Sequence, residues 1–279
     1  MNLKYRNQRN AEAVAGFWGR SADDRFDWYA IKAQGLESTE ILIYDIIGWP
    51  FNDAGELVRA LAGLDTKEIV VRINSPGGDI FDGFAIFNAL SRHKARIITQ
   101  VEALAASAAS VLMMAGTDIQ AYRNAMTMIH NPWAVVGGDD DALRDVADVL
   151  AKIKGSMIDI YADRSGTGKR EIKTMMKAET WMTAKEAKDK GFVDTIIDSP
   201  AKAKAEWDLS MFANAPDEYR RTRDDELTER DAEKALRDAG FSRSKAKALL
   251  AGRQQMPEAA VIQAVADVAK NTLSLFQAR

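Results

Sequence analysis

The chain has 279 residues, 47% of them hydrophobic, which is enough for one large domain with a buried core and an appendage. Its 38 basic and 41 acidic residues give a formal charge of −3, so no global charge favours nucleic acid or an anionic membrane as partner. The absence of cysteine excludes disulfides, cysteine-ligated zinc and thiol nucleophiles, and the two histidines, His93 and His130, cannot form a histidine-rich metal site. We expect no cofactor.

No apolar run reaches the roughly 18 residues that a membrane-spanning helix needs. The first twenty residues contain no apolar segment typical of a signal peptide. We therefore expect a soluble, cytoplasmic protein without a membrane partner.

The first forty or so residues are polar and predict irregular structure. After them the chain alternates aliphatic runs with segments of helical spacing. This pattern predicts strands at 40–47 and 68–73, helices at 54–64 and 80–93, and a turn at the "SPGG" of 75–78. A strand, a turn and a helix in repeated order indicate an α/β fold.

The next segment predicts a strand at 95–101, a short apolar helix at 110–116, and a hairpin-like pair at 118–122 and 126–130. A long helix is expected at 139–166, where one face carries Leu143, Val146, Leu150, Ile153, Met157 and Ile160 through about seven turns. Such a helix should project and pack against the body of the protein or against another subunit.

Two shorter helices follow, at 169–177 and from Thr183 to a stop at Gly191, and "FVDTII" predicts a last strand. Residues 200–227 are charged, contain two prolines and show no periodicity, which is typical of a linker. From Thr228 the chain is helical again, with a capping box in "TERD" and a further helix start at Pro257.

The motif "INSPGGDIFDG" places Gly77 and Gly78 between a predicted strand and a predicted helix. Backbone N–H groups at such a junction are free to face an anion, and glycine permits both close approach and positive φ. On this motif alone, an ordinary strand-to-helix turn is an equally good interpretation.

The phrase "LAASAAS" places Ser107 at the next strand-to-helix junction, among residues small enough for a substrate backbone to lie across them. There the hydroxyl would lie near the positive end of the helix dipole, and the amide of Ala108 would point at a developing oxyanion. The alternative interpretation is a packing seam of small residues.

His130 follows the apolar run "AMTMI", and Glu179 separates two predicted helices. A serine, a histidine at a strand end and a carboxylate form the set needed for nucleophilic acyl transfer, in which the imidazole takes the serine proton. A structural histidine is the alternative for His130. His93 lies in a charged turn, where a solvated role is expected.

These motifs together resemble the ClpP-type serine peptidases over residues 40–197. "INSPGG" matches the oxyanion loop of that family, "AASAAS" its nucleophile motif, "MIHNP" its histidine motif, and "TAKEAKDKGFVDTI" its closing helix and strand. The resemblance implies that the protein is a serine-type endopeptidase, a hydrolase of proteins or peptides.

Carried over to this sequence, the resemblance makes Ser107, and not Ser110, the nucleophile and His130 the general base. Glu179 stands where the family usually has aspartate, so its longer side chain must recoil to reach the imidazole. Weaker substitutes for the acid are Asp163 and Asp194. The implied oxyanion hole consists of Gly77, Gly78 and Ala108.

The implied fold is a spiral α/β domain of the ClpP and crotonase type with a projecting handle helix, which assembles into homo-oligomeric rings. The expected domains are an N-terminal extension (1–39), the peptidase domain (40–199), a linker (200–227) and a helical, scaffold-like tail (228–279). A crotonase-like acyl-CoA enzyme would share the fold, but it would not need a serine, a histidine and an acid in this order.

The phrases "WYAIKAQGLESTEILIYDIIGW" and "ETWMTA" look more like the head maturation (prohead) proteases of tailed phages. This resemblance implies capsid or scaffold protein as substrate and partner, action in the host cytoplasm or inside an assembling virion head, and self-cleavage within 200–227. A ClpP-like subunit working with a AAA+ unfoldase, or a non-catalytic capsid assembly protein, is the alternative. The tail resembles a helix–turn–helix only in outline, so nucleic acid is not the expected partner.

Overall fold

The computed structural model describes residues 14–16, 18, 21, 23, 27–33, 36–134, 136–198, 209 and 212–216. All of these residues belong to one compact unit, 1–220. The predicted helical tail and most of the predicted linker lie outside the described residues, so the predictions made for them stay predictions.

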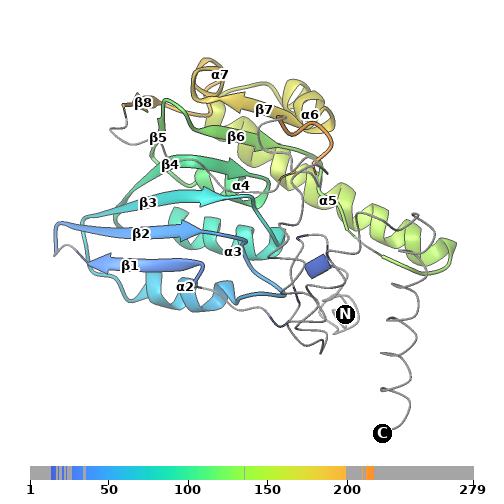
Figure 1. Cartoon of the computed structure of the whole chain (residues 1–279), viewed down its shortest axis with the longest axis horizontal. Helices are drawn as coiled ribbons and strands as arrows, with labels where there is room; N and C mark the ends of the chain where they lie inside the picture. Colours follow the sequence, from blue (N-terminus) through green and yellow to red (C-terminus); the bar gives the residue numbers. More distant parts are fainter. Residues whose placement is uncertain are drawn as a thin grey trace, which may run out of the picture. The chain divides into compact units, whose positions relative to one another are not determined.

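An eight-stranded sheet forms the frame of this unit (Figure 1). Its strands are β1 (Tyr29–Ala33), β2 (Ser38–Tyr44), β3 (Glu68–Ser75), β4 (Arg96–Ala106), β5 (Asp118–Tyr122), β6 (Met126–Ile129), β7 (Thr180–Thr183) and β8 (Thr195–Ile197). The helices are α2 (Ala54–Ala62), α3 (Ile80–Ser91), α4 (Ala108–Met113), α5 (Asp140–Ser165), α6 (Lys169–Lys177) and α7 (Ala184–Asp189). The α/β fold predicted from the alternating pattern is confirmed.

Strands β2, β3 and β4 pair in parallel, as strand–helix–strand connections require, and β1 adds an antiparallel edge. Strand β4 has 11 residues, which makes it longer than the predicted strand 95–101. Beyond β4 the order continues through β5 to β8, while β6 pairs with β4 and β7. The sheet therefore branches at β4.

The hairpin-like pair expected at 118–122 and 126–130 is wrong. Strand β5 runs parallel to the first half of β4, at Ile98–Val101, and β6 runs parallel to its second half, at Leu104–Ala106. The chain between them therefore continues in the same direction along β4 instead of reversing. Because β4 is long, it has room for both partners on one edge.

Two short strands are absent from the sequence prediction. The irregular start expected for the first forty residues is wrong at β1, which pairs antiparallel with β2 from Tyr29↔Ile43 to Ala33↔Thr39. Strand β7 pairs antiparallel with β6. Both are short and lie at edges of the sheet, so neither needs the long aliphatic run that identifies a strand buried on both faces.

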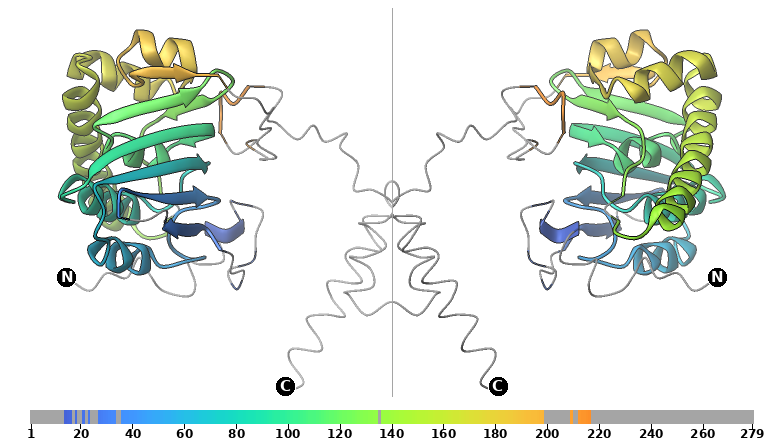
Figure 2. Two further views of the ribbon diagram at one scale, coloured as in Figure 1. Left: turned by 90° about the vertical axis from the view of Figure 1, so that its left-hand side faces the viewer. Right: turned by 90° about the vertical axis from the view of Figure 1, so that its right-hand side faces the viewer.

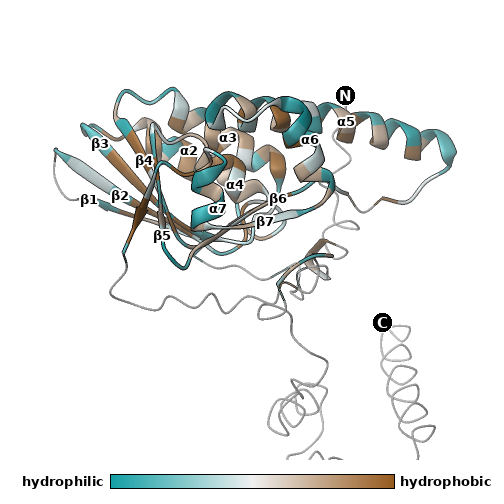
Figure 3. Ribbon diagram, turned by 90° about the horizontal axis from the view of Figure 1, so that it is seen from above, coloured by the Kyte–Doolittle hydropathy of each residue, from teal (hydrophilic) through white to brown (hydrophobic). Residues whose placement is uncertain are grey.

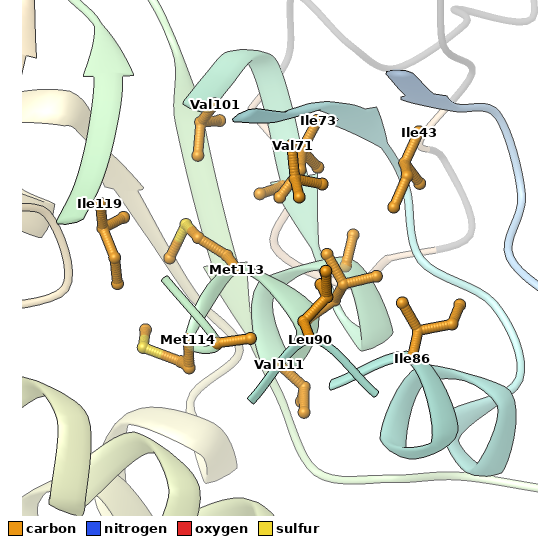
Figure 4. Packing of buried hydrophobic residues seen from close by; sticks show 14 of the residues in the cluster. Ile43, Val71, Ile73, Ile86, Leu90, Val101, Val111, Met113, Met114 and Ile119 are labelled. Atoms are coloured by element: carbon orange, nitrogen blue, oxygen red, sulfur yellow. The ribbon is translucent and has the colours of Figure 1, made fainter. Parts of the chain in front are cut away.

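Helices α2, α3 and α4 cover one face of the sheet (Figure 3). Strand residues of this face, such as Val71, Ile73 and Val101, lie opposite Leu90 of α3 and Val111 of α4 (Figure 4). All five side chains are at most 1% exposed, and each burial stabilises the fold by roughly 1.5–3 kcal/mol. This core fixes the strand ends from which the candidate site is built.

Helix α5 has 26 residues, from the N-cap Asp139, whose side chain accepts a hydrogen bond from the Ala142 N–H, to a left-handed Gly166 at its C-terminus. The predicted apolar face packs fully only in the C-terminal half, at Ile153 and Met157, and Leu143 is 45% exposed. Figure 3 shows that α5 extends beyond the other helices. Its role in stacking rings stays a prediction. Neither α5 nor any other described helix is apolar enough over 18 residues to cross a membrane.

Candidate active site

Ser107 occupies the sharp junction between β4, which ends at Ala106, and α4, which begins at Ala108. Its φ of 54° and ψ of −124° are unusual for a residue with a side chain. The Ser107 N–H donates to the Met128 carbonyl at 3.0 Å, while its own carbonyl accepts the Ser110 N–H at 3.0 Å. These bonds hold a strained conformation of the kind that concentrates at functional sites.

The alanines around Ser107 are packed without space for larger side chains. Ala106, Ala108 and Ala109 are 0% exposed, and a β-carbon placed on Gly83 of α3 would lie 3.1 Å from the Ala108 Cβ. The packing seam proposed as an alternative for "LAASAAS" therefore exists. It coexists with the strand-to-helix junction that positions the Ser107 hydroxyl.

The two serines of this phrase have different surroundings. Ser110 is fully buried, and its hydroxyl donates to the Ser107 carbonyl at 2.7 Å and lies 2.8 Å from the Tyr161 hydroxyl of α5. Ser107 is partly exposed. Ser110 thus fixes the junction from within, and Ser107 presents a hydroxyl to the surface.

His130 directly follows β6, and its Nε2 lies 2.7 Å from the Ser107 Oγ. The pairing of β6 with the end of β4 brings the two residues together. The side chain of His130 is 7% exposed, and this burial lowers its pKa to about 4, with a smaller opposing effect from the Glu179 carboxylate. The imidazole is therefore neutral at pH 7 and able to accept a proton from the hydroxyl.

Glu179 lies between α6 and β7 in a left-handed backbone conformation, with φ of 49°. In the β6–β7 pairing Ile129 faces Thr180, so the next pair along this antiparallel register is His130 and Glu179. Among the described residues, however, no hydrogen bond joins the Glu179 carboxylate to the His130 ring. The carboxylate accepts instead from the backbone N–H groups of Ala213 and Asn214, at 3.1 and 2.6 Å.

The two weaker substitutes for the acid lie in other surroundings. Asp194 is paired with Arg164 and accepts the Ile119 N–H at 2.7 Å, which ties the segment after α7 to β5 and α5. Asp163 is exposed on α5, where its charge acts on Lys169. The structure therefore brings Ser107, His130 and Glu179 together and leaves both substitutes outside the group.

The two glycines of "SPGG" lie against this group in conformations that side chains rarely adopt, with φ of 99° at Gly77 and 151° at Gly78. A β-carbon on Gly77 would lie 2.6 Å from the Ser107 Cβ and 3.0 Å from the Ala108 nitrogen. A β-carbon on Gly78 would lie 2.0 Å from the Ile47 carbonyl oxygen. Only glycine fits either position without strain.

Sequence reasoning missed the part of the site that comes from residues 212–216, which we call the C-terminal turn. Phe212 packs edge-on against the His130 ring, with centroids 5.5 Å apart, and against Trp181 at 5.8 Å. Leu209, Phe212 and Ala215 are all buried. Their regular spacing of three residues was the one sign in the sequence that part of the predicted linker packs against the domain.

Comparison with known proteins identifies the family. The model of the Clp protease family matches residues 23–200. The ATP-dependent Clp protease proteolytic subunit of Bacteroides fragilis is 33% identical over 185 residues, which cover 61% of this chain and 89% of the relative. The ATP-dependent Clp protease proteolytic subunit 1 of Protochlamydia amoebophila is 32% identical over 172 residues, which cover 59% of this chain and 82% of the relative. The chain belongs to the Clp protease family.

Membership in the Clp protease family supports the resemblance drawn from the motifs, and it extends the matched region to residue 23, which includes β1. The expected family is thereby confirmed. Within the described residues no group of three or more acidic or histidine side chains is arranged to hold a metal ion.

Proposed function

We propose that this protein is a serine endopeptidase of the ClpP type, with Ser107 as nucleophile, His130 as general base and Glu179 as the acid that supports the imidazole. The observation that carries the proposal is the 2.7 Å contact between the Ser107 Oγ and the His130 Nε2 at a strained strand-to-helix junction. A nucleophile and a base within hydrogen-bond reach are the minimum for acyl transfer.

In the first step, the Ser107 Oγ attacks the carbonyl carbon of the scissile peptide bond while His130 Nε2 takes the hydroxyl proton. The imidazolium then gives that proton to the leaving amine, and an acyl-enzyme remains on Ser107. A water molecule, deprotonated by His130 in the same way, releases the acid and restores the serine.

The oxyanion formed on the carbonyl oxygen needs N–H donors that have no other acceptor. Ala108 is the first residue of α4, so its N–H has no partner within the helix. The Gly77 N–H donates to the Ser75 Oγ at 3.1 Å, whereas the Gly78 N–H has no acceptor among the described residues. We therefore assign the donor roles to Gly78 and Ala108 and a space-making role to Gly77.

The relatives are proteolytic subunits, which supports a protein or peptide as substrate. The homo-oligomeric ring implied by the motif resemblance stays a proposal. Two finer roles are possible within this substrate class. They differ in the substrate and in whether an unfoldase delivers it. The name of the relatives, ATP-dependent Clp protease, favours delivery by an ATP-driven unfoldase. The resemblance of "ETWMTA" to head maturation proteases favours a capsid or scaffold protein as substrate. Cleavage of an unfolded test protein only with an unfoldase and ATP supports the first role, and cleavage of co-expressed capsid protein without either supports the second.

The proposed activity is tested with a fluorogenic peptide and three proteins: wild type, Ser107→Ala and His130→Ala. Wild type should release the fluorophore, and each variant should lose roughly 10³-fold or more of that rate because nucleophile and base act as a unit. His93→Ala is the matched control, since His93 lies in a turn at the end of α3 and should leave the rate unchanged. Equal rates for wild type and Ser107→Ala would refute the proposal.

A further inference from the structure

The C-terminal turn makes three hydrogen bonds to the segment that carries Glu179. The Ala213 N–H donates to Oε2 of Glu179 at 3.1 Å, and the Asn214 N–H donates to Oε1 at 2.6 Å. The Asn214 side chain also donates from Nδ2 to the Ala178 carbonyl at 2.9 Å. Both carboxylate oxygens are therefore held by adjacent backbone amides, a geometry that suits an anion.

Apolar packing holds the turn in place beside the base. Phe212 is 4% exposed and packs edge-on against the rings of His130, Trp181 and Trp18. The ring centroids of Phe212 and Trp18 are 6.4 Å apart. Together with Leu209 and Ala215 it packs in one buried cluster with residues of β4 and β6, namely Leu104, Ala106 and Met128. The turn, orange in Figure 2, thus lies against the strands that end at the catalytic residues.

We propose that the C-terminal turn is a tether for the catalytic acid: the Ala213 and Asn214 amides position the Glu179 carboxylate, and Phe212 encloses the imidazole. This inference rests on the proposed peptidase function and adds positioning residues to it. The turn comes from sequence more than 30 positions after Glu179, beyond the last strand of the sheet.

The identity of residue 179 gives a reason for such a tether. Glutamate has one more rotatable bond than the aspartate of the resembled motif, so its carboxylate must fold back to face the imidazole, and an unrestrained side chain would lose that orientation to rotamer freedom. Amides on both oxygens restrict the carboxylate to one location. The third donor, Trp181 Nε1, lies 3.3 Å from Oε1 and acts in the same way.

Among the described residues, the C-terminal turn contacts Glu179 and His130 but not the nucleophile Ser107. Its contacts go to the Glu179 carboxylate and to the ring of His130, a residue that is 7% exposed, whereas Ser107 is partly exposed. A segment that blocked substrate would instead be expected to lie over the hydroxyl. This distribution of contacts favours support of the base over inhibition.

The tether is tested by removing one amide donor from the full-length protein. The Ala215 N–H to Phe212 carbonyl contact, 3.5 Å, closes a turn in which residue 213 is the second position, where proline is well tolerated. Ala213→Pro removes that N–H and places the proline Cδ where the hydrogen pointed at Glu179, and Ala213→Ser retains the N–H as the conservative variant. Labelling by a fluorophosphonate probe gives the maximal labelling rate and the half-saturating concentration for each protein.

We expect Ala213→Pro to lower the maximal labelling rate roughly 10- to 100-fold through misplacement of the acid, with an unchanged half-saturating concentration, and Ala213→Ser to restore most of the rate. In a Glu179→Gln background, Ala213→Pro should have little further effect, because the two changes act through one carboxylate. Asn214→Ala, which removes only the anchor to Ala178, gives a second variant in case proline disturbs the turn, with an expected loss of a few-fold.

The outcomes separate the tether from the function on which it rests. A wild type that is not labelled at Ser107 would refute the peptidase assignment and the tether together. Labelling of wild type at Ser107, with equal rates for Ala213→Pro and Asn214→Ala, would overturn the tether alone. A faster rate in either variant would also overturn it and would show that the turn inhibits the site.

Discussion

The two halves of the candidate site are built in different ways. Ser107 and the glycine loop lie at the ends of adjacent parallel strands, where β3, β4 and their helices fix the backbone and the surrounding side chains are fully buried. Glu179 lies on a partly exposed connection between α6 and β7, and its carboxylate is held by a turn 34–35 residues further along the chain. The position of Ser107 depends on the core, whereas the position of the Glu179 carboxylate depends on a few exposed hydrogen bonds.

This contrast implies different responses to mutation. A change near Ser107 must displace closely packed backbone, so it should affect folding and activity together. Loss of a hydrogen bond to the Glu179 carboxylate should alter the chemistry with a small effect on unfolding, because these bonds lie at the surface.

The largest effect is expected at Gly77. In Gly77→Ala the new β-carbon would lie 2.6 Å from the Ser107 Cβ and 2.7 Å from the Ala106 carbonyl oxygen, in a backbone with φ of 99°. Peptide hydrolysis should fall more than roughly 10²-fold, because a shift of about 1 Å in the nucleophile costs that much, and the thermal midpoint should fall as well.

The matched control for this change is Gly155→Ala. Gly155 lies inside α5, and nothing is within 4 Å of an added β-carbon. Alanine there should raise the stability by about 1 kcal/mol and leave hydrolysis unchanged. If Gly77→Ala behaved like Gly155→Ala in thermal unfolding and in hydrolysis, the close packing on the nucleophile side would be wrong.

Ser110→Ala should give the next largest effect, on stability. The change leaves the hydroxyl of the fully buried Tyr161 without the partner that now lies 2.8 Å away. The free energy of unfolding should drop by about 1–3 kcal/mol, measured by denaturant titration. Ser156→Ala, an exposed serine of α5, is the control and should change it by less than about 0.5 kcal/mol. Equal values for the two variants would contradict the assigned role of Ser110.

The smallest expected change in activity is a shift of its pH dependence, which is set by the pKa of His130. Burial lowers the pKa of His130 to about 4, so the neutral base and the activity should be lost only as the pH falls through about 4. Phe212→Ala removes the ring that covers the His130 imidazole. Water can then reach the imidazole, which raises the pKa of His130 towards its ordinary value of 6.5. The acid limb of the kcat/KM profile should then move to higher pH. An unmoved limb would show that Phe212 does not enclose the imidazole.

The sequence predicts the nucleophile side well because local patterns encode it. Aliphatic runs identify β2, β3 and the start of β4, and the small residues at 105–110 suit both a tight junction and the packing seam around it. The hairpin expected after residue 118 fails because pairing with β4 depends on the full length of that strand, which no local pattern gives.

The acid side is only partly visible in the sequence. Glu179 can be chosen from its motif, but its hydrogen bonds come from Ala213 and Asn214, whose side chains give no sign that their backbone amides are used. Leu209, Phe212 and Ala215 recur at intervals of three, yet the charged residues around them favour a linker. A backbone N–H can donate a hydrogen bond whatever its side chain, so contacts of this kind cannot be predicted from residue identity.

The central claim is that Ser107 is the nucleophile activated by His130, and site mapping of a fluorophosphonate adduct tests it most directly. Wild type, Ser107→Ala and Ser110→Ala are incubated with the probe, and the adduct is located by peptide mass spectrometry. We predict one adduct per chain, on Ser107, in wild type and in Ser110→Ala, and none in Ser107→Ala. An adduct on another serine, or one that persists in Ser107→Ala, would contradict the account.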